Sequence, residues 1–201
     1  MKNMMKVSVI LPVKDEPYLP QMIDRIKRVI PCDVHVQREP GLANAVLRGV
    51  KASIGDVVCV LDADGSHNPS YLPAMIQRLS EADIVVGSRY VRGGGTQDYF
   101  MRMLLSRLFC KFARALLRLK VNDNMSGFVV AKREVFEQHH YQPLGYKFIL
   151  ELLVKGRDKF TVVEYPVVFE KRKMGLSKTG FGQGIKTFMF ILKLWIWSVI
   201  R

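Results

Sequence analysis

The chain has 201 residues, of which 49% are hydrophobic and 24% are charged. This length and composition are typical of one well-buried globular domain and exclude a disordered chain. The formal net charge of +13 predicts an anionic partner, such as a phosphorylated substrate, a membrane surface or a nucleic acid. The three cysteines lack metal-ligand spacing, so we expect free thiols in a reducing compartment. We expect no signal peptide and no membrane-spanning helix, because no apolar segment reaches about 20 residues.

The first half of the chain alternates between strand and helix patterns. Strands are expected at 7–13, 33–36, 57–61 and 83–87, and helices at 19–30, 41–52 and 68–79. This order indicates an α/β fold with a mostly parallel sheet and helices on both faces. Ligands of such sheets bind beyond the carboxyl ends of the strands. The loops that follow the third and fourth strands are therefore the first places to look for a site.

The second half begins with a glycine-rich loop at 93–95. A long helix is expected at 99–119, strands at 126–131 and 162–169, and a final helix at 184–200. The long helix carries a basic stripe, because about 60° of its circumference holds Arg107, Lys111, Arg114 and Arg118. Such a stripe is typical of a buried helix with a solvated arginine face, or of a helix that lies on anionic lipid.

The final helix is apolar around nearly its whole circumference over residues 188–200, and it contains Trp195 and Trp197. Burial against the domain or a partner would explain this pattern. Docking at a membrane interface, where tryptophan is favoured, would also explain it.

Two carboxylates, Asp62 and Asp64, directly follow the apolar strand at 57–61, and Ser66 comes two residues later. An Asp-Gly pair after a strand is also common turn chemistry. Carboxylate oxygens are hard ligands that suit a divalent cation. A cation held there would stabilise a diphosphate as a leaving group.

Cationic residues follow two other predicted strands. Arg89 ends the strand at 83–87, where it is either an exposed loop residue or a bidentate phosphate ligand. The segment 169–178 carries four cations around Gly175. It is either a solvated basic loop or a flap that closes over phosphates.

An ordered set of motifs covers nearly the whole chain: residues 9–16, 41–45, 55–56, 62–64, 67–69, 83–90, 123–128, 145–147 with Glu151, and 169–178. Together they resemble the family 2 glycosyltransferases of the GT-A type, specifically the dolichyl-phosphate mannosyltransferase, or polyprenyl-phosphate glycosyltransferase, group. The resemblance implies inverting, metal-dependent transfer of a sugar from a nucleoside diphosphate sugar, such as GDP-mannose, to a polyprenyl phosphate. The metal would be Mg²⁺ or Mn²⁺.

The resemblance also implies roles for individual residues. The donor would contact Pro12, Glu16, Asp62, Asp64, Ser177 and Lys178. The metal would be held by Asp62, Asp64 and Ser66, and the acceptor phosphate by Arg89, Arg102, Ser106 and Arg172. The implied catalytic residues are Asp62, Asp64 and Arg89. An acceptor phosphate is already a nucleophilic anion, so the reaction needs positioning of two anions more than a strong base.

Two departures from the family pattern stand out. The family has a second strand that ends in two Asp residues and a Gly-Ser turn, whereas residues 30–38 here run almost directly from the first helix to the strand before Gly41. Base recognition would then fall to Gln37 or Asp33. The third metal ligand is often Gln in the family, and Ser66 is a weaker one.

We expect residues 1–180 to form the catalytic domain and residues 181–201 an apolar interfacial helix. The chain would be cytoplasmic and peripheral on the inner membrane face, with a partner subunit or self-association as another means of attachment, and it would bind no nucleic acid. Two other functions fit the sequence. One is a transferase that acts on a glycan or other hydroxyl acceptor, and the other is a degenerate, non-catalytic subunit that binds sugar nucleotides.

Overall fold

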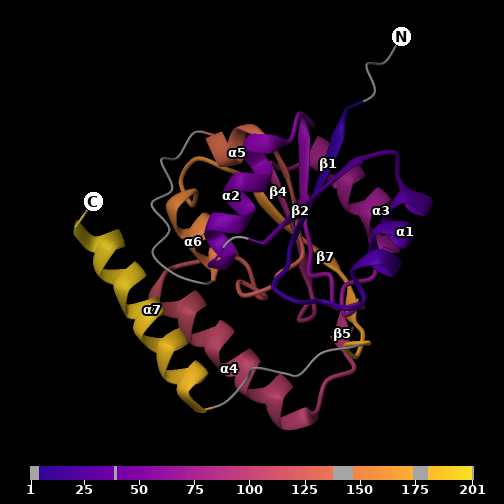
Figure 1. Ribbon diagram of the computed structural model, residues 1–201. Helices are drawn as coiled ribbons and strands as arrows, with labels where there is room; N and C mark the ends of the chain where they lie inside the picture. Colours follow the sequence, from indigo (N-terminus) through magenta and orange to yellow (C-terminus); the bar gives the residue numbers. More distant parts are fainter. Residues whose placement is uncertain (1–4, 39, 138–146, 174–180, 201) are drawn as a thin grey trace.

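The computed structural model describes residues 5–38, 40–137, 147–173 and 181–200 (Figure 1). Its centre is a six-stranded sheet of order β2-β1-β3-β6-β4-β7. These strands are β1 (Val7–Pro12), β2 (Asp33–Gln37), β3 (Val57–Val60), β4 (Ile84–Ser88), β6 (Val129–Lys132) and β7 (Val162–Pro166). All neighbouring strands are parallel except those that pair with β6, which runs antiparallel to β3 and β4. The predicted mostly parallel α/β fold is confirmed.

The remaining elements surround this sheet. They are α1 (Leu19–Val29), α2 (Leu42–Ala52), the short 3-10 helices η1 (Pro69–Tyr71) and η2 (Arg78–Ser80), α3 (Leu72–Gln77), α4 (Phe100–Leu116), α5 (Glu134–Glu137), α6 (Phe148–Lys155), α7 (Phe181–Ile200) and a two-stranded sheet of β5 (Gly95–Thr96) and β8 (Val168–Phe169). The helix predicted at 68–79 is therefore divided into three segments. The strand predicted at 162–169 breaks at Val167, whose amide bonds to the Ser88 carbonyl before the chain enters the smaller sheet.

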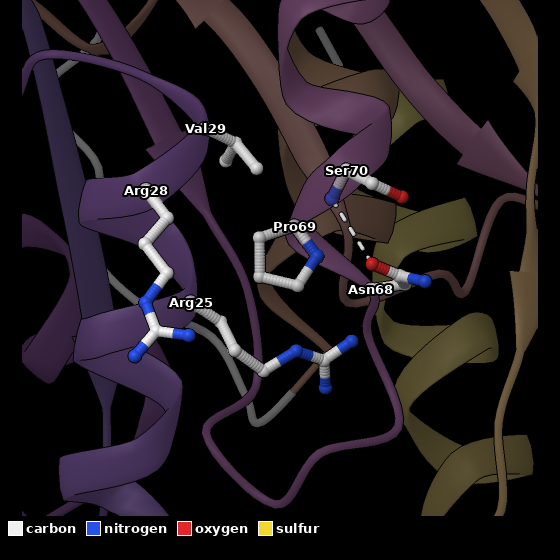
Figure 2. Close-up of a pocket in the computed structure, with 6 residues that line it drawn as sticks. All are labelled: Arg25, Arg28, Val29, Asn68, Pro69 and Ser70. Atoms are coloured by element: carbon white, nitrogen blue, oxygen red, sulfur yellow. Dashed lines mark hydrogen bonds between the residues drawn. The ribbon is translucent and has the colours of Figure 1, made fainter.

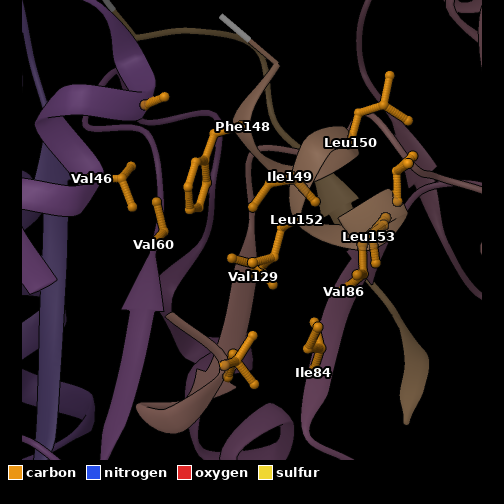
Figure 3. Packing of buried hydrophobic residues seen from close by; sticks show 14 of the residues in the cluster. Val46, Val60, Ile84, Val86, Val129, Phe148, Ile149, Leu150, Leu152 and Leu153 are labelled. Atoms are coloured by element: carbon orange, nitrogen blue, oxygen red, sulfur yellow. The ribbon is translucent and has the colours of Figure 1, made fainter. Parts of the chain in front are cut away.

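One side of the sheet packs on α1 and α3, and the other packs on α2 and α6. On the α6 side, Val46, Val60, Val129 and Phe148 belong to one buried cluster (Figure 3). The sequence pattern missed α6 because its residues from 148 to 154 are all buried. A helix that is buried all round has no polar face, so it lacks the periodicity by which helices are predicted.

Between α1 and α2 there is a single strand, β2, which lies at the end of the sheet order. It pairs with β1 from Ser8↔Asp33 to Pro12↔Gln37. The shortened segment seen in the sequence therefore forms the one strand β2 between these helices. Among the described residues, no further strand of the sheet lies beyond β2.

Helices α4 and α7 lie side by side along one side of the molecule (Figure 1), where the Phe112 and Phe188 rings stack with centroids 5.5 Å apart. From α7, Phe190, Ile191 and Leu194 enter the core. Helix α4 ends at Leu116, earlier than predicted, and Arg118 has a left-handed φ of 52°. The basic stripe on this helix is therefore Arg107, Lys111 and Arg114 without Arg118. No helix in the described part of the chain is long and apolar enough to cross a membrane.

Candidate functional site

The loop after β3, residues 61–67, is called the Asp loop here because it carries Asp62 and Asp64. Asp64 is 3% exposed, and its Oδ1 accepts hydrogen bonds from the Ser66 amide (2.9 Å) and the Ser66 hydroxyl (2.6 Å). Gly65 between them has φ +84°, a left-handed conformation that favours glycine. Asp64 thus closes a turn, and its second oxygen, Oδ2, is directed elsewhere. Asp64 can therefore close the turn through Oδ1 and serve a carboxylate site through Oδ2.

His67 holds the backbone of the other aspartate. Its Nδ1 accepts a hydrogen bond from the Asp62 amide (2.9 Å), which assigns the proton to Nε2, 3.9 Å from Asp62 Oδ2. Burial lowers the pKa of His67, more than the neighbouring Asp62 and Asp64 raise it, so the ring is neutral at physiological pH. The Asp62 side chain is 41% exposed. Sequence patterns assigned no role to His67, although its position just after the two carboxylates was an available signal.

Residues 170–173, called the strap, run along the Asp loop. The Glu170 amide bonds to the Ser66 carbonyl (2.9 Å), and the Lys173 amide bonds to the Asp64 carbonyl (3.0 Å). Arg172 Nε pairs with Asp64 Oδ2 at 2.9 Å. Arg172 was predicted to hold the acceptor phosphate, but here it neutralises a carboxylate of the predicted metal site. Ser177, Lys178 and Gly175 lie outside the described residues.

Arg89, at the end of β4, is held from several directions. Its Nε and Nη2 make a bidentate pair with Asp123 at 2.7 and 2.8 Å, and Nη2 lies 3.4 Å from the Ser106 hydroxyl. The Tyr90 and Phe169 ring centroids are each 4.9 Å from its guanidinium carbon. Burial opposes the charge of Arg89, but the Asp123 carboxylate raises its pKa further, so the side chain is always cationic. Its Nη1 makes no hydrogen bond to a described residue and remains available for a ligand.

Asp123 is a residue whose role the sequence did not reveal. It is completely buried, and its amide donates to Glu164 on β7 at 3.0 Å. Lys147, which precedes α6, is another. Burial, followed by the charge of Arg89, lowers the pKa of Lys147, while Asp62 and Asp123 act in the opposite direction. Lys147 therefore lies near enough to Arg89, Asp62 and Asp123 to feel their charges.

Phe169 joins the two halves of the site. Its ring lies 4.4 Å from the His67 ring and 4.9 Å from the Arg89 guanidinium carbon. On α4, Ser106 reaches Arg89, whereas Arg102, one turn earlier, pairs with Asp98 at 3.1 Å. The structure therefore brings Asp62, Asp64, Arg89 and Ser106 to one edge of the sheet, with Arg172 on the Asp side.

The predicted base-recognition residues lie at opposite ends of β2. Asp33 pairs with His35 and accepts a hydrogen bond from Ser8 (2.8 Å) at the start of the strand, away from the ligand-binding edge. Gln37 lies beside Pro12 at the carboxyl end, and its carbonyl accepts from the Val13 amide (2.8 Å). Pro12 ends β1 at the same edge, and Glu16 follows it. Asp33 is therefore wrong as a candidate for base recognition, and Gln37 stays a prediction.

The described residues contain no group of three or more His, Cys, Asp or Glu side chains that could by itself hold a metal ion. Asp62, Asp64 and Ser66 offer hard oxygen atoms from a single loop, which suits Mg²⁺ or Mn²⁺. Water or a ligand oxygen would have to complete the coordination shell. The donor set therefore fits such a cation, provided that Arg172 leaves Asp64.

The described residues form two hollows. One of about 220 Å³ is lined by Arg25, Arg28, Val29, Asn68, Pro69 and Ser70 (Figure 2). None of these residues was predicted to bind a ligand. A smaller one of about 70 Å³ is lined by Tyr90, Arg107, Lys111, Arg114 and Asn122. It adjoins the Arg89 half of the site through Tyr90.

Residues 10–139 match the family model described as glycosyl transferase family 2. The dolichol-phosphate mannosyltransferase of Pyrococcus furiosus is 40% identical over 145 residues, which cover 70% of this chain and 41% of that protein. The polyprenol monophosphomannose synthase of Mycolicibacterium smegmatis is 32% identical over 186 residues, which cover 87% of this chain and 70% of that protein. The chain thus spans less than half of the first relative's length.

Solved structures share the fold. Glucosyl-3-phosphoglycerate synthase from Mycobacterium tuberculosis, in complex with Mn²⁺, UDP-glucose and phosphoglyceric acid, superposes with a TM-score of 0.70 at 18% identity, covering 95% of this chain and 80% of that one. A further mycobacterial protein superposes with a TM-score of 0.74 at 19% identity, covering 94% of this chain and 74% of that one. At this identity the likeness establishes the fold alone.

Proposed function

Because the chain belongs to glycosyl transferase family 2, we propose that it transfers a sugar, mannose, from a nucleoside diphosphate donor to the phosphate of a polyprenol with inversion. One observation carries this proposal. The Asp loop and the Arg89–Ser106 pair share one edge of the sheet and are joined through Phe169. The carboxylates of the Asp loop suit a cation and the diphosphate that it would bind. The guanidinium of Arg89 suits a second phosphate.

In the proposed reaction, an oxygen of the acceptor phosphate forms a bond to the anomeric carbon while the bond from that carbon to the diphosphate breaks. The nucleoside diphosphate leaves with the electron pair, and no proton has to be removed from the phosphate dianion. Asp123 holds Arg89 with Nη1 available, so the guanidinium can orient the attacking phosphate. On the donor side, Ser66 holds the Asp64 carboxylate and His67 holds the Asp62 backbone.

A divalent cation at Asp62 and Asp64, when bound, would offset the charge that develops on the leaving diphosphate. The oxygen donors of the Asp loop support Mg²⁺ or Mn²⁺ as the choice. Because Arg172 pairs with Asp64, the same strap that is expected to serve the acceptor must rearrange when a cation binds.

The test is a screen of nucleoside diphosphate sugars with Mg²⁺ or Mn²⁺ and a polyprenyl phosphate, in which labelled glycolipid is measured. Asp64→Asn keeps an oxygen that can close the Ser66 turn but removes the charge, and we expect it to lower transfer by about 10²- to 10³-fold. Asp56→Asn is the matched control, since Asp56 is exposed and, among the described residues, its carboxylate bonds only to the Lys6 amide. Transfer that survives in Asp64→Asn would contradict the cation assignment. Nucleotide binding without glycolipid for any donor would favour the non-catalytic alternative.

We also propose that the chain is peripheral on the cytoplasmic membrane face and docks through α4 and α7. Both helices expose large apolar side chains: Phe100, Met101, Leu105 and Leu108 on α4, and Ile185, Met189, Ile196, Val199 and Ile200 on α7. The exposed cations of α4 would face anionic lipid. Under this proposal residues 181–201 act as an interfacial helix after a catalytic domain at 1–180.

Deletion of α7 is a poor test of docking, because Ile191 and Leu194 are fully buried in the core. Substitution of its outer face avoids this problem. Ile196→Ser should weaken binding to anionic vesicles by about tenfold, since burying such a side chain contributes about 1.5 kcal/mol or more. Ile54→Ser is the control, because Ile54 is 73% exposed but lies on neither helix. Equal binding of both variants would refute docking through α7.

A further inference from the structure

The hollow of about 70 Å³ beside Tyr90 is lined by one sign of charge. Its charged lining residues are Arg107, Lys111 and Arg114, and no Asp or Glu lines it. Among the described residues, neither Arg107 nor Lys111 takes part in an ion pair, although the Arg107 guanidinium lies 5.8 Å from the Tyr90 ring centroid. Three cations that converge without a carboxylate repel one another unless an anion joins them. The volume exceeds that of one water molecule and suits a small anionic group.

The three cations sit on successive turns of one helix and are not randomly disposed. Positions 107, 111 and 114 of α4 fall within about 60° of one another at 100° per residue. Arg114 is anchored, because it donates to Asn122 Oδ1, while the Asn122 amide groups donate to Glu164 at 2.8 and 2.9 Å. The Glu164 charge is thus taken up behind the hollow by Asn122 and the Asp123 amide. The helix therefore presents a row of cations, anchored at Arg114, to a ligand.

Tyr90 adds a polar group to this row. Its hydroxyl is buried and makes no hydrogen bond with a described residue. Burial raises the pKa of Tyr90, and the nearby Arg89 and Ser106 only partly offset that rise, so the hydroxyl keeps its proton. A buried hydroxyl whose contact with Ser106 falls short of a hydrogen bond is costly, and an anion in the hollow would accept one from it.

The exposed surface of α4 beside the basic stripe is apolar. Leu104, Leu108 and Met101 are 37%, 53% and 62% exposed, and helical spacing places them next to Arg107 and Lys111. A ligand with an anionic head and an apolar tail matches both surfaces. We propose that this hollow is a second phosphate site, which binds the phosphate group of an anionic membrane phospholipid beside the acceptor half of the active site.

This inference goes beyond sugar transfer and shares with the proposed function only the position of α4 at a membrane. The lipid phosphate would contact Tyr90 and the three α4 cations, whereas the acceptor phosphate is predicted to contact Arg89, Arg102, Ser106 and Arg172. Bound lipid would hold the entrance of the acceptor half against the membrane surface.

The experiment titrates short-chain phosphatidic acid, below its micelle concentration, into the full chain by calorimetry without any sugar donor. Inorganic phosphate and short-chain phosphatidylcholine are the comparison probes. We expect phosphatidic acid to bind more tightly than either. Lys111→Gln should weaken it by about tenfold, and Tyr90→Phe by about three- to tenfold, in line with the loss of one charge-assisted hydrogen bond. Lys193→Gln removes an exposed charge from α7 and should change it by less than about twofold, as expected for an exposed charge outside the site.

Three outcomes would overturn the proposal. Equal losses in Lys111→Gln and Lys193→Gln would mean unspecific attraction by net charge. Loss in Arg102→Gln with no loss in Lys111→Gln would place the lipid in the acceptor half. Inorganic phosphate that binds as tightly as phosphatidic acid would mean a site for free phosphate. Tyr90→Phe keeps the ring and every charge, so it tests the proposal even where a charge variant fails to fold. Unchanged binding of phosphatidic acid in this variant would also overturn the proposal.

Discussion

Replacing Arg172 with Gln should strengthen the binding of a divalent cation, because Arg172 occupies the carboxylate that the cation needs. Arg172 Nε lies 2.9 Å from Asp64 Oδ2, and the Asp64 side chain is 5% exposed while the Arg172 side chain is 36% exposed. A partly exposed ion pair contributes up to about 1 kcal/mol. A cation that must displace Arg172 loses that amount, so we expect Mn²⁺ to bind about fivefold more tightly to Arg172→Gln, at 1.4 kcal/mol per tenfold change.

The assay follows free Mn²⁺ by electron paramagnetic resonance during titration, without donor or acceptor. Lys173→Gln is the matched control, since it removes the same charge from the same strap but pairs with Glu170 at 3.4 Å and not with Asp64. Arg172→Lys keeps a cation and should resemble the unmodified chain. If Arg172→Gln binds Mn²⁺ no better than Lys173→Gln, the reasoning is refuted, because Arg172 then does not compete for Asp64.

Three further predictions concern the scaffold of the site. Asp123→Asn leaves Arg89 buried without its carboxylate and should cost about 3–5 kcal/mol of unfolding free energy in urea; a loss below about 1 kcal/mol, the value of an exposed pair, would contradict the assigned pairing. Gly65→Ala should lower the free energy of unfolding by about 1–2 kcal/mol and weaken Mn²⁺ binding, because φ is +84° and a new Cβ would meet Lys173 Cγ at 2.6 Å. Unchanged stability and affinity would contradict both this backbone strain and the close contact between the strap and the Asp loop. Burial alone would raise the pKa of Asp83, but hydrogen bonds from Lys132 and Thr161 lower it below its usual 3.8. The stability from Asp83 is therefore present above that value and lost as the pH falls through the folded-state pKa, so Asp83→Asn should lower the melting temperature at neutral pH but not in strong acid; an equal drop at both pH values would contradict this sign.

Much of the sheet could be predicted from the sequence because its strands are short, apolar and bounded by clear turn residues. The pattern of residues 57–61 placed Asp62 and Asp64 at the carboxyl end of a buried strand, and β3 ends at Val60. The direction of each strand in the sheet was harder to predict from the sequence. The antiparallel direction of β6 depends on how the chain returns between β3 and β4, which no local pattern records.

The sequence indicated the two halves of the site but not the contacts that tune them. The Arg172–Asp64 pair joins residues more than 100 positions apart, and the Arg89–Asp123 pair joins two motifs that the sequence presents separately. Such contacts depend on the folded path of the strap and of β4. The role of Phe169 between His67 and Arg89 has the same origin, since the sequence shows only an apolar residue at a strand end.

The central claim is that the acceptor nucleophile is a phosphate held by Arg89 and not a hydroxyl activated by a base. The most direct measurement supplies a labelled nucleoside diphosphate mannose and Mg²⁺ together with either a polyprenyl phosphate or the corresponding polyprenol, and recovers labelled lipid. We predict mannolipid from the polyprenyl phosphate alone, with the anomeric configuration inverted. Mannolipid from the polyprenol, or equal product from both acceptors, would contradict the account.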